Sequence, residues 1–162
     1  MISGIGTDIV QVARMEELIK KHGEKFLQKI FTDFELESSK KRADKTVFLS
    51  ARWAAKEAVS KALKCGIGRD CAWRDINIKN DKNGAPFVEL TGKASELAEK
   101  QNVSNIQLSI SHDKDYAVAL VVIERRKNVE YIFLAWVGIN YTSDLVQEVL
   151  PVIRNPNSLS RI

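Results

Sequence analysis

Three acidic side chains in this sequence stand where a metal ion or a reacting group would need them. Asp8 interrupts an apolar run at the start of the chain, and Glu57 lies within an alanine-rich segment. Asp113 follows His112 at the end of an alternating apolar segment. An acid within an apolar strand is costly to bury unless a cation or several hydrogen bonds hold it. Two carboxylates near basic residues favour Mg²⁺ on a diphosphate, because this ion prefers oxygen ligands and keeps water and phosphate oxygens among them.

Each of these acids also has an ordinary structural interpretation. Asp8 could cap or precede the helix expected from residue 12 onward. His112 and Asp113 could form a tight hairpin connection, because Asp tolerates such turns well. His112 would then be the last inward-facing residue of its strand. The residues alone leave both interpretations open.

Residues 52–63, with the sequence RWAAKEAVSKAL, predict an amphipathic helix that approaches its neighbours closely. Its apolar stripe consists of Ala51, Ala54, Ala55, Ala58, Val59, Ala62 and Leu63. Its polar face consists of Arg52, Lys56, Ser60 and Lys64. Glu57 and Lys61 lie at the border, where a carboxylate can be held in one geometry. The simpler alternative is an ordinary i,i+4 ion pair between them, worth about 0.2–0.5 kcal/mol.

Positive charge is concentrated between residues 40 and 64, where eight basic residues stand against two acids. Such a segment attracts phosphates, acidic proteins or nucleic acid. A nonenzymatic nucleic-acid-binding module would interleave aromatic side chains for stacking on bases. Only Phe48 and Trp53 qualify in this segment, and Asp8 and Glu57 would repel a nucleic acid. The pattern therefore argues against a nucleic-acid-binding module. It leaves open a phosphorylated ligand, an acidic protein or an ordinary solvated helix face.

The composition is typical of a soluble globular protein, with 44% hydrophobic and 28% charged residues in a chain of 162. Two cysteines, Cys65 and Cys71, are too few for a disulfide framework. Because no signal segment is evident, they are interpreted as reduced thiols in a cytoplasmic protein. The apolar run at residues 131–139 is shorter than the roughly 20 residues that cross a bilayer, so no membrane span is expected.

Hydrophobic periodicity predicts an α+β fold, with helices on one side of an antiparallel sheet. Strands are expected at residues 1–10, 76–79, 86–90, 106–111 and 116–123, and the last is apolar on both faces and therefore central. Helices are expected at residues 12–22, 24–30, 46–64 and 91–101. Thr32 and Glu35 have the spacing of a capping box that begins a further helix. Asn83 and Gly84 predict a hairpin turn between the second and third strands.

Several segments, taken in order, resemble the holo-acyl-carrier-protein synthases, the short single-domain group of 4′-phosphopantetheinyl transferases. They are GIGTDIV at 4–10, Arg14, FTDFELE at 31–37, FLSARWAAKEAVSKAL at 48–63, NGAP at 83–86 and LSISHDKDYAVA at 108–119. The match runs over roughly residues 1–124. A lone K-E-A helix would be a weak signal, but its pairing with an early G-T-D is specific.

The resemblance implies transfer of 4′-phosphopantetheine from coenzyme A to a serine of an acyl carrier protein, with release of 3′,5′-ADP, for fatty acid biosynthesis. Asp8 and Glu57 match the carboxylates that hold Mg²⁺, and Lys61 matches a lysine on the diphosphate. The base could be Glu57 through a metal-bound water, His112 or Asp113, and this choice stays open. Contacts to coenzyme A are implied for Arg52, Lys56, Lys61, Lys64, Asn83, Gly84, Pro86 and His112. A family member that binds the carrier without catalysis is the remaining alternative.

The resemblance also implies partners and an assembly. Arg14 and Met15, on the first helix, match the surface that accepts the acyl carrier protein. The family forms homotrimers with sites at subunit interfaces, so one chain need not hold a complete site. Residues 1–126 are expected to be the transferase domain and 127–162 an extension of uncertain role. We expect the apolar run at 131–139 to dock on the trimer surface or on a sheet edge.

Overall fold

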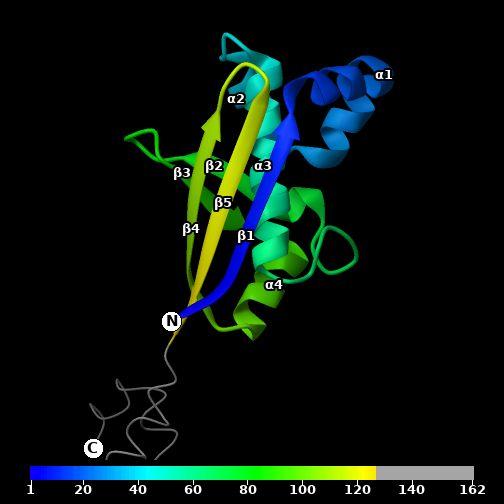
Figure 1. Ribbon diagram of the computed structural model, residues 1–162. Helices are drawn as coiled ribbons and strands as arrows, with labels where there is room; N and C mark the ends of the chain where they lie inside the picture. Colours follow the sequence, from blue (N-terminus) through cyan, green and yellow to red (C-terminus); the bar gives the residue numbers. More distant parts are fainter. Residues whose placement is uncertain (127–162) are drawn as a thin grey trace, which may run out of the picture. The chain divides into compact units, whose positions relative to one another are not determined.

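Five strands form two antiparallel sheets in the part of the chain that the structure, a computed structural model, describes, which is residues 1–126 (Figure 1). The larger sheet has the order β1-β5-β4, and β2 pairs with β3 in a separate hairpin. The strands are β1 (Ile2–Gln11), β2 (Ile76–Asn80), β3 (Pro86–Leu90), β4 (Val103–His112) and β5 (Tyr116–Arg125). The expected α+β fold with an antiparallel sheet is confirmed, and β5 is the central strand of its sheet, as predicted.

The helices lie on one face of the larger sheet, and α3 crosses that face along its length (Figure 1). They are α1 (Val12–Ile30), α2 (Asp33–Lys40), α3 (Lys45–Ala62) and α4 (Gly92–Lys100), together with a short 3-10 helix, η1 (Trp73–Asp75). The two helices expected before residue 30 are joined as α1, which kinks at Gly23, where φ is 60°. No helix within residues 1–126 is both long enough and apolar enough to cross a bilayer.

Two glycines of β1 let α3 lie directly on the sheet. A Cβ atom added to Gly4 would overlap the backbone oxygen of Ala62, and one added to Gly6 would overlap that of Ala58. Glycine on the strand and alanine on the helix therefore set the distance between the two elements. This close approach places the border residues of α3 beside β1.

Side-chain caps fix where α2 and α3 begin. The Thr32 hydroxyl accepts from the Glu35 N–H, and the Glu35 carboxylate accepts from the Thr32 N–H at 2.8 Å, which confirms the predicted capping box. Asp44 Oδ1 accepts from the Val47 N–H at 2.9 Å at the start of α3. The β2–β3 hairpin turns at Gly84, where φ is 86°, as the Asn-Gly step predicts.

The polar face that the sequence predicts for α3 is not solvated. Arg52, Lys56 and Ser60 are buried together with the alanine stripe. The amphipathic interpretation is wrong here because α2, η1 and β2 lie against the side of α3 that faces away from the sheet. Periodicity shows which face is more apolar, but it does not show how many neighbours a helix has.

The outer face of the larger sheet, which α3 does not cover, is apolar and exposed. Ile5 and Ile9 of β1 and Val118 and Leu120 of β5 are all exposed there, and Tyr116 extends the same face. An apolar face of this kind is unusual on a lone soluble domain and marks an interaction surface. The predictions for residues 127–162, including the run at 131–139, fall outside the described residues.

Candidate functional site

A cavity of about 140 Å³ opens at the β1 edge of the larger sheet and brings the two candidate metal ligands together. Asp8 and Glu57 both line it, and Arg14 and Trp53 form part of its wall. Asp8 comes from β1 and Glu57 from α3, so the close Gly–Ala packing of these elements is what joins two acids 49 positions apart. We call this the carboxylate cavity.

Lys61 binds Asp8 rather than Glu57. Its Nζ atom lies 2.7 Å from Asp8 Oδ1 and donates to the Thr7 carbonyl oxygen at 3.0 Å. The ordinary i,i+4 pair with Glu57 is therefore absent from the described contacts, and Asp8 does not cap α1, whose cap position is Gln11. Asp8 therefore shares a cavity with Glu57 and an ion pair with Lys61.

The donor set of the carboxylate cavity fits a magnesium ion. Within residues 1–126, no group of three or more His, Cys, Asp or Glu side chains gathers at a metal-binding spacing. Zinc and other ions with all-protein ligand sets are therefore a poor match for this cavity. Mg²⁺ needs only one or two carboxylates, because it keeps waters and takes phosphate oxygens from its substrate. Asp8 and Glu57 supply that number of ligands.

A second cavity, of about 400 Å³, opens at the β4 edge and is lined by positive charge. Arg42, Arg52 and His112 line it, together with Asn80 from β2. Asp44 also lines it, but one of its carboxylate oxygens is bound to the α3 N-terminus. We call this the cation cavity. Its composition suits a phosphorylated ligand, because guanidinium groups bind phosphates in a fixed geometry.

Arg52 is the most informative residue of the cation cavity. Its side chain is 6% exposed, yet no carboxylate in the described chain pairs with it, and its Nε atom has no hydrogen-bond partner there. Nη2 donates to Asn80 Oδ1, and the guanidinium carbon lies 4.4 Å from the centre of the Phe48 ring. Burial lowers the pKa of Arg52 to about 10, which still leaves it charged at neutral pH. A buried cation with an unused donor is poised for an anionic ligand.

The β2–β3 turn forms one wall of the cation cavity. Asn80 Nδ2 donates to the Gly84 carbonyl oxygen at 2.6 Å, which connects the turn to Arg52. Gly84 and Pro86 line the cavity, as the resemblance implied. Asn83 does not line it, because its N–H turns back to Asp81 Oδ1 at 2.8 Å.

His112 lines the cation cavity, not the carboxylate cavity. It ends β4 and is exposed, whereas Asp8 lies on β1, with β5 between the two strands. Two strand spacings correspond to roughly 10 Å, so His112 and Asp8 of one chain are not neighbours.

Asp113 holds the turn after β4. Its Oδ1 atom accepts from the N–H groups of Asp115 at 2.8 Å and Tyr116 at 2.7 Å. These two bonds lower the pKa of Asp113, and a carboxylate stabilised in this way is a poor proton acceptor. Among the candidate bases, Asp113 is therefore the least suitable, and its hairpin-turn interpretation is confirmed.

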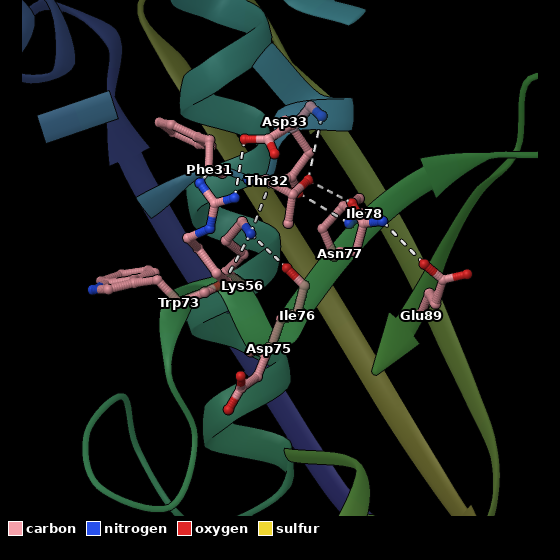
Figure 2. Close-up of polar contacts among 12 residues, drawn as sticks. Phe31, Thr32, Asp33, Lys56, Trp73, Asp75, Ile76, Asn77, Ile78 and Glu89 are labelled. Atoms are coloured by element: carbon pink, nitrogen blue, oxygen red, sulfur yellow. Dashed lines mark hydrogen bonds and ion pairs between the residues drawn. The ribbon is translucent and has the colours of Figure 1, made fainter. Parts of the chain in front are cut away.

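Two residues that the resemblance placed in contact with coenzyme A, Lys56 and Lys64, line neither cavity. Lys56 is fully buried, and its ammonium group is enclosed by Glu35 and by backbone carbonyl oxygens of Trp73 and Ile76 (Figure 2). A phosphate therefore cannot reach Lys56. Lys64 is exposed beyond the end of α3 and lines neither cavity. Met15, expected to contact the carrier, is fully buried, and it lines the carboxylate cavity with Arg14.

Two residues of the cation cavity were missed as ligand contacts by the sequence reasoning. Asn80 gave no signal beyond its place just before a hairpin turn. Phe48 was considered only as a side chain for stacking on bases, although it stands four residues before Arg52, the spacing at which a helical cation and ring can meet. Arg42 lies above the same ring at 5.2 Å, so the two arginines share one aromatic support.

The comparisons with known proteins identify the family of the chain. Residues 4–121 match the family described as the 4′-phosphopantetheinyl transferase superfamily. A holo-[acyl-carrier-protein] synthase of Vibrio cholerae is 45% identical over 126 residues, which cover 78% of this chain and all of that protein. The structure of the Neisseria meningitidis synthase matches with a TM-score of 0.73 and 38% identity, over 77% of this chain and all of that one. The Helicobacter pylori synthase, solved with coenzyme A, matches with a TM-score of 0.67 and 37% identity, over 74% and 99%.

Proposed function

Because this chain belongs to the 4′-phosphopantetheinyl transferase superfamily, we propose that it transfers phosphopantetheine from coenzyme A to a serine of an acyl carrier protein. The observation that supports this proposal most is the pair of cavities with opposite charge. One offers Arg52 without a carboxylate partner, as a phosphorylated coenzyme requires. The other offers Asp8 and Glu57 beside Lys61, as a magnesium–diphosphate requires.

The transfer forms one phosphorus–oxygen bond and breaks another. The serine oxygen of the carrier bonds to the β-phosphorus, the bridging oxygen leaves on 3′,5′-ADP, and the serine proton passes to a base. Asp8 and Glu57 would hold Mg²⁺, which supplies positive charge to the diphosphate when bound. Lys61 adds a cation next to the same phosphates. Such chemistry depends on positioning and charge, so no nucleophilic side chain of the enzyme is required.

The base in this proposal is either Glu57, through a water, or His112. Glu57 is half-buried in the carboxylate cavity, and its carboxylate has no partner in the described hydrogen bonds and ion pairs. His112 faces the cation cavity. Both positions are compatible with a serine that approaches the coenzyme from outside the chain.

We propose that a complete site forms between two copies of the chain in a homotrimer. The carboxylate cavity opens at the β1 edge and the cation cavity at the β4 edge, so the two lie on opposite edges of one sheet. A head-to-tail contact that brings the β4 edge of one copy to the β1 edge of the next would unite them, and such contacts close into rings. The exposed outer face, with Ile5 and Ile9, would be buried in the same assembly.

The carrier protein would dock beside the carboxylate cavity. Arg14 is exposed on α1 and lines that cavity, so its charge is available to an acidic partner close to the transferred phosphate. We place the enzyme in the cytoplasm and its role in fatty acid biosynthesis, in keeping with free thiols at Cys65 and Cys71.

A transfer assay tests the proposed activity. The full chain is incubated with apo acyl carrier protein, coenzyme A and Mg²⁺, and the carrier is weighed by mass spectrometry. We expect a mass gain of one phosphopantetheinyl group, which disappears with EDTA or with a carrier whose acceptor serine is replaced by alanine. Stable carrier binding without any mass gain would instead favour a binding protein that has lost catalysis.

Subunit mixing tests the shared site. Glu57→Gln removes a carboxylate and Arg52→Met removes a cation, so each variant retains one intact cavity. Activity is measured at a coenzyme concentration far below the raised KM of Arg52→Met, where that variant alone is nearly inactive. If sites form between copies, refolding the two variants together then restores activity to about a quarter of the wild-type value under random mixing. Mixed samples no more active than the separate variants would place each site within a single chain.

A further inference from the structure

A buried ion pair on the side of α3 that faces away from the sheet is not used by the proposed chemistry. Lys56 Nζ lies 2.9 Å from Glu35 Oε2, and both side chains are fully buried (Figure 2). Lys56 also donates to the carbonyl oxygens of Trp73 at 2.9 Å and Ile76 at 2.5 Å. All three ammonium hydrogens therefore have acceptors, and these acceptors come from α2, η1 and β2.

Two backbone N–H groups donate hydrogen bonds to the Glu35 carboxylate. Oε2 accepts from the Thr32 N–H at 2.8 Å, and Oε1 accepts from the Ile78 N–H at 2.9 Å. The ion pair therefore has a fixed orientation, because backbone donors bind the Glu35 carboxylate and backbone acceptors bind the Lys56 ammonium group. Replacing a buried ion pair with apolar side chains is often neutral or stabilising, so stability alone does not account for this pair.

The opposite face of α3 packs on β1 through small side chains. That face is a stripe of alanines, with Ala58 and Ala62 against glycines of β1. Such a surface lacks the ridges and grooves that normally fix how a helix packs. Lys56 and Ala58 point in directions about 200° apart on the helix. The hydrogen bonds and ion pair of Lys56 therefore restrain the rotation of α3 from the side opposite the sheet.

Rotation of α3 would displace both halves of the site. Glu57 follows Lys56 directly, and Arg52 lies one turn before it. A rotation of about 20° moves a group about 6 Å from the helix axis by roughly 2 Å. A misplacement of about 1 Å can lower the rate of a positioned reaction by about 100-fold.

We propose that Glu35 and Lys56 are a positioning pair that fixes the rotation of α3, and so places Glu57 beside Asp8 and Arg52 in the cation cavity. This inference rests on the proposed function, because it assigns those residues to the site. Glu35 and Lys56 touch neither substrate nor metal, and they act only through α3.

The structure supplies an optical reporter of this rotation that needs no substrate. Trp53 on α3 and Trp73 on η1 meet edge to face, with ring centres 5.6 Å apart and an interplanar angle of 90°. Coupling between the two rings contributes to the near-ultraviolet circular dichroism, and it changes when α3 turns relative to η1. Trp136 is the remaining tryptophan, so a Trp136→Phe background isolates this signal.

The test compares Glu35→Gln/Lys56→Met with Glu37→Gln/Lys40→Met in the full-length Trp136→Phe chain. The control makes the same two changes at an exposed pair on α2 with a 2.5 Å contact. We expect the buried double variant to melt cooperatively, to lose the Trp53–Trp73 signal and to lower kcat at least about 10-fold, with KM for the carrier within about twofold. The control variant should match the parent in cooperative melting, in the Trp53–Trp73 signal, in kcat and in KM.

Two results would overturn the proposal. One is a folded buried double variant whose kcat and Trp53–Trp73 signal stay within about twofold of the parent, since α3 then needs no pair to hold its rotation. The other is a double variant that does not fold, while Glu35→Gln alone folds with an unchanged signal and kcat. Failure of the proposed function is separate, because wild-type protein would then lack transfer activity while the optical test still reported on α3.

Discussion

The two cavities on either side of α3 are built in opposite ways. In the carboxylate cavity, Asp8 already has a cation, Lys61, at 2.7 Å. In the cation cavity, Arg52 is more deeply buried but has no carboxylate partner in the described chain. In the carboxylate cavity, an incoming cation would replace Lys61 as the partner of Asp8. In the cation cavity, an anionic ligand would be the first counter-charge of Arg52. With the ligands of the proposed function, we expect coenzyme A to stabilise the cation cavity more than Mg²⁺ stabilises the carboxylate cavity.

The largest effect should follow a change in the carboxylate cavity. Glu57→Gln keeps the shape of the side chain and removes the charge that we assign to the metal. We expect kcat/KM for transfer to fall on the order of 10³-fold, and added Mg²⁺ should not restore it. Initial rates measured by carrier mass across a magnesium titration check this. Glu37→Gln, on an exposed part of α2, is the matched control, and equal rates for the two variants would remove Glu57 from the metal site.

A substitution in the cation cavity should raise KM for coenzyme A rather than lower kcat. Arg52→Met removes a buried cation that lacks a carboxylate partner, so we expect KM for coenzyme A to rise about 10- to 100-fold. The free energy of unfolding should stay within about 1 kcal/mol of the parent or increase, because an uncompensated charge leaves the interior. Saturation kinetics and urea unfolding measure the two effects. Arg42→Met, at the exposed side of the Phe48 ring, should raise KM only about two- to threefold.

A smaller effect is expected at Lys61, which links the carboxylate cavity to the proposed diphosphate. Lys61→Met should lower kcat about 10-fold, because one positive charge near the phosphates is lost. The Lys61 side chain is half exposed where it pairs with Asp8, so the free energy of unfolding should change by less than about 1 kcal/mol. Stopped-time transfer assays at saturating coenzyme measure the kcat change. Lys64→Met, one turn along and outside both cavities, should leave kcat unchanged; a similar loss in both variants would indicate a general charge effect.

Local signals in the sequence were sufficient for much of this fold. The capping box of Thr32 and Glu35 and the Gly84 turn are short-range features, and both were predicted correctly. The sequence also paired Asp8 with Glu57 as candidate ligands, although only through a resemblance. The structure adds that both line one cavity.

The error at Lys56 has a physical cause that lies outside its own helix. A single helix pattern shows which residues are polar, but burial depends on elements that arrive from elsewhere in the chain. Lys56 is enclosed because Glu35 and the backbone at Trp73 and Ile76 supply its hydrogen bonds. Those partners are 17 to 21 residues away in sequence, so no local rule could identify them. Asn80 was missed for the same reason, since its importance comes only from Arg52.

The smallest effect concerns Asp113, the carboxylate that holds the turn after β4. Two backbone N–H groups stabilise ionised Asp113 and lower its pKa below the ordinary value of 3.8. Folded protein therefore gains stability from this ionisation at pH values above the unfolded pKa, and loses it as pH falls through the lower folded pKa. Asp113→Asn keeps an acceptor oxygen but loses the charge, so we expect a slightly lower urea midpoint at pH 7 and a difference that shrinks toward pH 2.

Urea midpoints measured at pH 7, 5, 3 and 2 check this prediction. Asp115→Asn changes the same charge on the same turn, but its carboxylate accepts no hydrogen bond among the described residues, so its difference from the parent should be smaller. Transfer rates at pH 7 should remain within about twofold for both variants, because Asp113 holds the turn and does not take the serine proton. If Asp113→Asn instead lowers kcat 100-fold with an unchanged urea midpoint, Asp113 takes part in the proton transfer and its assignment to the turn alone is wrong.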